Sequence, residues 1–174
     1  MKLNYFHLIL VVILKLILNE NQMNCLHGFK GYTQLELGNI NILISVPHDG
    51  YLRPGDVKNR TESNIVIDYN TRKFADVLRE ELTILFKNKR AIQAQPFIVY
   101  NNLHRTKLDP NRNDIECCFN KQDDAFRAYT DYHSLIQKYF VDDFILNGQK
   151  RYEQGLLIDM YDLNYMLFLN ILIM

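Results

Sequence analysis

The sequence predicts an α/β protein in which helices cover both faces of a mostly parallel or mixed sheet. Short apolar runs of strand length alternate with longer segments whose apolar residues recur every three or four positions. The order strand, helix, strand, helix, strand is typical of parallel strands joined by packed helices. The 174 residues, 48% of them hydrophobic and 23% charged, are enough for one domain with its own core.

The charge balance argues against recognition by a global electrostatic field. Lys+Arg and Asp+Glu each number 20, so the formal net charge is zero. A chain without a basic excess has no long-range attraction for polyanions. We therefore expect no nucleic-acid partner.

The first 24 residues have the layout of a secretory leader. Lys2 precedes an apolar run, Leu8–Leu14, and the polar stretch Asn19–Asn24 ends it. This pattern predicts an apolar leader helix at 1–24 that acts as a signal peptide, with a membrane-anchoring signal anchor as the alternative. The uninterrupted run is well short of the roughly 20 residues that span a bilayer. We therefore expect a secreted protein, in which Asn59-Arg60-Thr61 is a usable glycosylation sequon.

The first predicted strand and helix follow the leader. Residues 39–46, NINILISV, form a short apolar run that stops at Pro47, as in a buried strand. Gly50, Pro54 and Gly55 then mark a loop. Apolar residues recur at helical spacing over Tyr69–Lys87 and predict one amphipathic helix.

The second half of the pattern repeats this alternation. Residues 96–102, PFIVYNN, predict a second strand, and helical spacing covers Asp123–Leu146, where Gly148 would close the helix. Gly155–Tyr161, GLLIDMY, predicts a third strand. Because ligands of such sheets bind beyond the carboxyl ends of the strands, we expect the polar residues at these ends to share one edge.

His48 is the first candidate at that edge. It follows Pro47 directly after the first strand and precedes Asp49. A histidine held by a rigid neighbour at a strand end suits a metal ligand or a general base. A loop histidine without such a role has the same pattern.

The second candidate is the basic loop NNLHRTKLDPNRND, Asn101–Asp114. Arg105, Lys107 and Arg112 supply its cations, and Pro110 favours an extended backbone at Asp109. Asp109 would then orient one guanidinium while another meets a ligand carboxylate in a bidentate pair. A solvated surface loop is the alternative.

Three further features have plainer interpretations. Asp68, just before the first helix, suits either a helix cap or a site carboxylate. His133 lies on the apolar face of the second helix and is expected at the core or its edge. Cys25, Cys117 and Cys118 fit no metal or disulfide pattern and are expected to be ordinary thiols.

Five motifs together resemble the N-formylglutamate amidohydrolase family in order and approximate spacing. They are ISVPHDGYLRP, DYNTRKFADVL, NLHRTKLDPNRN, YHSLI and GLLIDM. The resemblance extends from about Ile42 to Met160, and its most specific part is His-Arg-x-Lys-x-Asp-Pro-Asn-Arg. It implies an incomplete version of a fold related to the zinc carboxypeptidases and aspartoacylase-like enzymes.

The resemblance also implies a chemistry, in which zinc activates a water that attacks an amide carbonyl. His48 would be a zinc ligand and Asp68 a second metal ligand, while Asp109 would brace an arginine. Three side chains would bind carboxylate and carbonyl oxygens of a small acidic N-acyl amino acid: Arg105, Asn111 and Arg112.

The sequence departs from the family after Asp159. Where the family pattern resembles Asp-Leu-His-Gly-His, this chain has Met160, Tyr161 and Asp162, and no histidine follows. The family's general-base glutamate would lie further on. We therefore expect a catalytically incomplete site, with a non-catalytic product that retains weak carboxylate binding as the alternative function.

These observations predict three parts of the chain. Residues 1–24 are the leader, 38–160 a partial, C-terminally truncated amidohydrolase-like domain, and 161–174 an apolar tail foreign to the family. The tail is too short to span a bilayer. It is expected either to add an edge element to the sheet or to expose an apolar patch.

Overall fold

The computed structural model describes residues 25–61, 64–90, 94–141, 145–146, 149–150, 155–163 and 166–173. Its main sheet has six strands in the spatial order β1-β2-β4-β3-β7-β8. Their bounds are β1 Cys25–His27, β2 Thr33–Glu36, β3 Ile42–Val46, β4 Phe97–Asn101, β7 Leu156–Leu163 and β8 Met166–Ile173. The predicted α/β class with a mixed sheet is confirmed. The predicted leader, 1–24, lies outside the described residues.

The centre of the sheet is parallel and its margins are antiparallel. β3 pairs in parallel with β4 on one side and with β7 on the other. β1, β2 and β8 are added in antiparallel orientation. The carboxyl ends of β3, β4 and β7 therefore share one edge, which is where the predicted site residues follow the strands.

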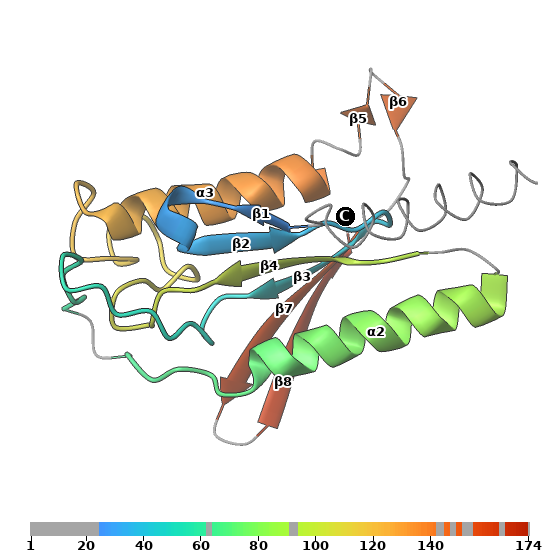
Figure 1. Ribbon diagram of the computed structural model, residues 1–174, viewed down its shortest axis with the longest axis horizontal. Helices are drawn as coiled ribbons and strands as arrows, with labels where there is room; N and C mark the ends of the chain where they lie inside the picture. The colour runs from blue at the N-terminus through green and yellow to red at the C-terminus, as the bar shows by residue number, and fades with distance from the viewer. Residues whose placement is uncertain are drawn as a thin grey trace, which may run out of the picture.

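Two helices cover opposite faces of the sheet (Figure 1). α2, Thr71–Arg90, packs on one face through Ala75 against a cluster that includes Ile44, Ile98 and Ile158. α3, Asp124–Ile136, covers the other face, where buried Tyr132 joins a cluster that includes Leu43 and Val99. Successive side chains of a strand point to opposite faces of the sheet, so alternate residues of the parallel strands pack into two separate cores.

The second helix is shorter than predicted. α3 ends at Ile136 and passes into a wider π-helical turn, η2, Gln137–Val141. Ile145–Leu146 (β5) then pairs with Gln149–Lys150 (β6) in a small hairpin. The prediction of helix as far as Leu146 was therefore wrong, because strand pairing overrides the helical spacing there. The predicted closing residue, Gly148, lies outside the described residues.

The edge strand β1 and its neighbour β2 were not predicted. They are joined through a 3-10 turn, η1 Phe29–Gly31, in which Lys30 and Gly31 have φ angles of 52° and 71°. β2 alternates buried and half-buried residues along Thr33–Glu36. That period of two is a strand signal, but it covers only four residues.

The apolar tail supplies the opposite edge of the sheet. β8, Met166–Ile173, pairs antiparallel with the whole of β7. Of the two predicted alternatives for the tail, the structure shows the edge element. No helix in the part of the chain that the structure describes combines the length and the apolar character needed to cross a membrane.

Candidate functional site

The loops after β3 and β4 are held close together, which fixes the geometry of the site. The Asn101 side chain donates to the backbone oxygens of Pro47 and Leu103, at 2.8 and 2.9 Å. A Cβ atom on Gly50 would lie 2.3 Å from the Leu103 oxygen, so this position requires glycine. The two loops therefore meet with almost no space between their backbones.

His48 lies between two carboxylates. Its Nδ1 is 2.9 Å from Asp68 Oδ2 and its Nε2 is 2.7 Å from Asp109 Oδ1, and the residue is 2% exposed. Burial alone lowers the pKa of the imidazole, but the hydrogen bonds to Asp109 and Asp68 raise it further, so the pKa lies above its ordinary value. The ring is thereby stabilised as a cation.

Asp109 is the centre of the charge network. It is fully buried, and its Oδ2 is 3.0 Å from Arg105 Nε, 3.5 Å from Arg60 Nη1 and 3.7 Å from Arg112 Nε. Burial raises the pKa of its carboxyl, but His48 and Arg105 outweigh burial and hold that pKa well below its usual range. The carboxylate is therefore ionised, and it links the histidine to three guanidinium groups.

The predicted substrate-binding arginines differ in accessibility. Arg105 is 9% exposed and also donates to Asp68 Oδ1 at 3.3 Å, so its guanidinium is occupied within the network. Arg112 has 43% of its side chain exposed and reaches Asp109 only at 3.7 Å. Lys107, the remaining cation of the loop, is buried and donates to the Val57 oxygen. Arg112 is thus the loop cation that faces solvent.

Asn111 is tied to the third strand end through Asp159. Its Nδ2 donates to Asp159 Oδ2 at 3.0 Å, while Asp159 Oδ1 accepts from Ser45 at 2.7 Å. Because the single proton of Ser45 points to Asp159, the Tyr132 hydroxyl must donate to Ser45, at 2.7 Å. Burial raises the pKa of Asp159. This chain of hydrogen bonds orients the exposed amide of Asn111.

Sequence reasoning missed three members of this arrangement: Arg60, Ser45 and Tyr132. Arg60 was noted only within the glycosylation sequon, yet it is buried, while Asn59 beside it is exposed. Ser45 is the one polar residue of β3, which was a usable signal. Nothing in the helical spacing around Tyr132 distinguished it from a core residue.

The two predicted metal ligands, His48 and Asp68, are in contact with each other. Asp68 Oδ2 and His48 Nδ1, 2.9 Å apart, could contact one ion with a small adjustment. A structural or catalytic zinc takes at least three protein ligands. Among the described residues, no three His, Cys, Asp or Glu side chains are grouped so that they could hold a metal. The described residues therefore supply two candidate ligands and do not complete a zinc site.

The other titratable candidates lie outside this network. His133 contacts the rings of Tyr129 and Tyr132, and its Nε2 lies 3.0 Å from the Pro110 oxygen, which places it at the edge of the core. Cys25, Cys117 and Cys118 are free thiols, as predicted.

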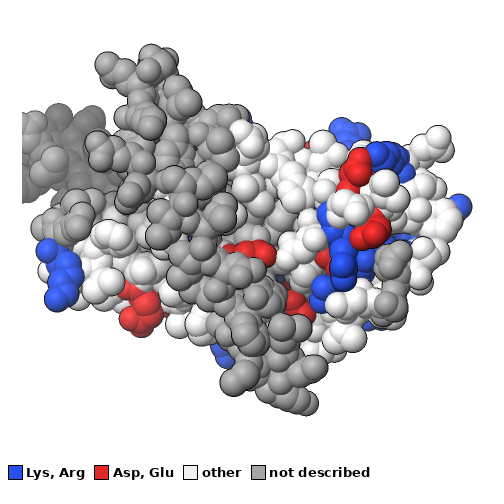
Figure 2. Space-filling model, turned by 180° about the vertical axis from the view of Figure 1, so that it is seen from behind, with Lys and Arg blue, Asp and Glu red and all other residues white. Residues whose placement is uncertain are grey.

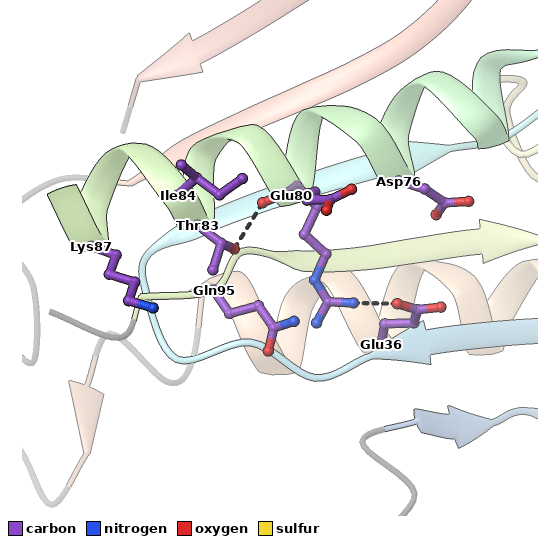
Figure 3. Close-up of a pocket in the computed structure, with 8 residues that line it drawn as sticks. Glu36, Asp76, Glu80, Thr83, Ile84, Lys87 and Gln95 are labelled. Carbon is purple, nitrogen blue, oxygen red and sulfur yellow. Dashed lines mark hydrogen bonds and ion pairs between the residues drawn. The ribbon is translucent and has the colours of Figure 1, made fainter. Parts of the chain in front are cut away.

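Charged side chains of both signs gather at the end of the molecule where β3 and β4 finish (Figure 2). A cavity of about 560 Å³ lies elsewhere, against α2 (Figure 3). It is lined by Glu36, Asp76, Arg79, Glu80, Thr83, Ile84, Lys87 and Gln95. Lys87, at the far end of the cavity, lies 16 positions beyond the helix start Thr71, or about 24 Å along the axis, and none of the lining residues belongs to the network around Asp109. The cavity is therefore separate from the predicted chemistry.

Comparisons with known proteins give no match: no family model, no curated protein and no solved structure is similar to this chain. The family resemblance therefore rests on the motifs quoted above.

Proposed function

We propose that this chain is an N-formylglutamate amidohydrolase-like protein that binds the carboxylate of a small acidic N-acyl amino acid. The observation that carries the proposal is the sharing of Asp109: one oxygen meets His48, and the other meets Arg105 and Arg112. The buried imidazole and an exposed guanidinium therefore contact the same carboxylate. On the same proposal the fold is zinc carboxypeptidase-like, and the leader directs secretion.

The proposed roles follow from exposure and partners. Arg112 forms an ion pair with the ligand carboxylate. Only its Nε approaches Asp109, at 3.7 Å, so the two terminal nitrogens of the guanidinium can donate to the ligand. Asn111, oriented by Asp159, donates to a carbonyl oxygen of the ligand. Arg105 donates to Asp109 and holds the neighbouring backbone in place. Because Arg105 is buried, it has little surface with which to contact the ligand directly.

Zinc enters the proposal only in part. His48 and Asp68 are the residues that would hold it, and a bound zinc would polarise the amide carbonyl and activate water. Since these two do not complete a zinc site, no hydrolytic step is assigned to the described residues. A carboxylate binder without turnover is the second candidate, favoured by the fact that both nitrogens of His48 already meet carboxylates.

Calorimetric titration with N-formyl-L-glutamate tests the binding proposal. Arg112→Ala should weaken the affinity at least tenfold, because it removes the cation that faces the ligand. Lys87→Ala, which removes a cation at the distant cavity, should leave the affinity unchanged. Equal affinities for wild type and Arg112→Ala would refute the proposal.

Zinc retention and glutamate release separate the two candidates. The wild-type chain is equilibrated with micromolar zinc and desalted, and its metal content and release of free glutamate from N-formylglutamate are measured. An amidohydrolase retains about one zinc per chain and loses both properties in Asp68→Asn. A protein that binds the ligand without retaining zinc or releasing glutamate is the non-catalytic binder.

A further inference from the structure

Three exposed aliphatic residues belong to backbone segments that are hydrogen-bonded to arginines of the charge network. Ile65, Val66 and Ile115 are 42%, 67% and 76% exposed. Scattered exposed aliphatic residues are normal on a protein surface. These three, here called the apolar rim, differ because their backbone segments are bound to the arginines of the site.

Arg60 holds the two segments of the apolar rim together. Its Nη1 donates to the Asn64 oxygen at 3.2 Å and its Nε donates to the Glu116 oxygen at 3.1 Å. Asn64 precedes Ile65 and Glu116 follows Ile115, so one guanidinium fixes both segments.

Arg105 adds a direct connection to the network. Its Nη1 donates to the Val66 oxygen at 3.1 Å, while its Nε donates to Asp109 at 3.0 Å. The Arg105 side chain therefore connects the Val66 backbone to the carboxylate of Asp109, which also contacts Arg112.

The turn that carries Ile115 is ordered by hydrogen bonds. The side-chain oxygen of Asn113 accepts from the backbone N–H groups of Ile115 and Glu116, at 2.9 and 3.0 Å. Arg112 immediately precedes this turn, and its backbone N–H donates to the backbone oxygen of Asp109 at 3.2 Å. A cation and an aliphatic side chain are thus presented three residues apart on a fixed backbone.

We propose that the apolar rim receives the aliphatic acyl chain of an acidic N-acyl amino acid whose carboxylate pairs with Arg112. The inference rests on the proposed function and narrows its ligand from small N-acyl amino acids to those with a medium-length fatty acyl group. Such a ligand has an anionic end and an apolar end. The guanidinium of Arg112 would contact the anionic end, and the apolar rim would cover the apolar end. Each methylene that is fully buried contributes about a fourfold gain in affinity, so a partly covered chain still has a measurable effect.

Two ligands that share a head group test the inference on the full chain. N-formyl-L-glutamate and N-octanoyl-L-glutamate, the latter below its micellar concentration, are titrated calorimetrically. We expect N-octanoyl-glutamate to bind wild type at least tenfold more tightly. The double variant Val66→Ser, Ile115→Ser should lose this advantage and keep its affinity for N-formylglutamate.

Two control variants exclude non-specific adsorption of the acyl chain. Leu85→Ser removes a 49% exposed aliphatic side chain from α2 and should leave both affinities unchanged. Arg112→Ala should weaken both ligands, because the carboxylate anchors each of them.

The outcomes distinguish this inference from the proposed function. Equal affinities of the two ligands for wild type would overturn the acyl-chain inference while leaving carboxylate binding intact. An octanoyl advantage that persists in the double variant, or that is insensitive to Arg112→Ala, would overturn it as well. If neither ligand binds, both the inference and the proposed function are wrong.

Discussion

The two ends of the sheet both carry charged side chains of both signs, but they arrange them differently. At the carboxyl ends of β3 and β4, the buried carboxylate of Asp109 serves four cationic groups. At the cavity beside α2, Arg79 forms an ion pair with Glu36 and donates to the Leu37 oxygen at 2.6 Å, and its buried Nε has no hydrogen-bond partner among the described residues. The network holds His48 and Asp109, whose pKa values are shifted by their shared hydrogen bond and by the neighbouring charges. A pocket of ligand size is therefore a weaker indicator of chemistry here than a set of converging buried charges.

The largest expected effect is the loss of the shared carboxylate. Asp109→Asn leaves His48 and Arg105 without their buried counter-charge, which costs roughly 3–5 kcal/mol of unfolding free energy. Glu36→Gln at the cavity removes a partner whose side chain is 30% exposed, so the cost is about 1 kcal/mol or less. Urea unfolding of both variants measures the difference. Similar losses would show that the two ends do not differ in the way their buried charges are supported.

A matched pair of tyrosine variants sharpens the comparison. Tyr132 donates to Ser45 at the site end, whereas buried Tyr100 donates to Asp76 on α2. Each Tyr→Phe change removes one buried hydrogen bond and should cost about 1–2 kcal/mol.

The two tyrosine variants should differ in ligand binding. Tyr132→Phe loosens Ser45 and so the Asp159 carboxylate that orients Asn111, and it should weaken the binding of N-formylglutamate several-fold. Tyr100→Phe should not change it. Thermal unfolding and calorimetry on the same samples measure both properties. A Tyr100→Phe variant with equally weakened binding would mean that the hydrogen-bond chain is not what orients the site.

The pH dependence of stability should report on the site end. None of the described residues that line the cavity is a histidine. The basic loop, in contrast, contains buried His104, which lies beside Arg53 of the loop after β3. Burial, then Arg53 and Lys107, lower the pKa of His104 below its ordinary value. At this residue the unfolded chain therefore binds more protons than the folded chain just below pH 6.5, so the contribution of His104 to stability should fall as the pH decreases through that range, opposite in sign to that of His48, whose pKa is raised.

The variant His104→Asn isolates this contribution. Its unfolding free energy should depend less steeply on pH between 5 and 7 than that of wild type, as measured by urea unfolding at several pH values. An unchanged slope would indicate that His104 is not held neutral in the folded state.

The predictable part of the molecule was the part encoded by local patterns. β3 and β4 are apolar runs ended by Pro47 and begun by Pro96, and α2 has a continuous helical spacing, so their order and the shared strand edge followed directly. β2 depends on pairing with β4, more than 60 residues further along the chain. Helix α3 was extended too far because apolar spacing alone does not reveal the competing local pair of β5 with β6.

The sequence predicted which residues belong to the site better than it predicted the hydrogen bonds between them. His48 and Asp109 were chosen from the loops that follow two strands, and Asp68 was chosen just before the first helix; the structure brings both carboxylates into contact with His48. That Asp109 would serve both the histidine and the arginines, and that Arg60 would join them, depends on where three loops cross in space. No spacing in the sequence encodes that crossing.

The smallest expected effect is on stability at Arg112, and it separates binding from folding. Its side chain is 43% exposed and its contact with Asp109 is 3.7 Å long, so Arg112→Ala should change the unfolding free energy by less than about 0.5 kcal/mol. Lys87→Ala, an exposed cation at the cavity end, should have an equally small effect. Equal stabilities with unequal carboxylate affinities would assign Arg112 to the ligand. If Arg112→Ala instead destabilised the chain as much as Asp109→Asn, the guanidinium would belong to the structural network, and the difference between the accessible rim and its buried support would disappear.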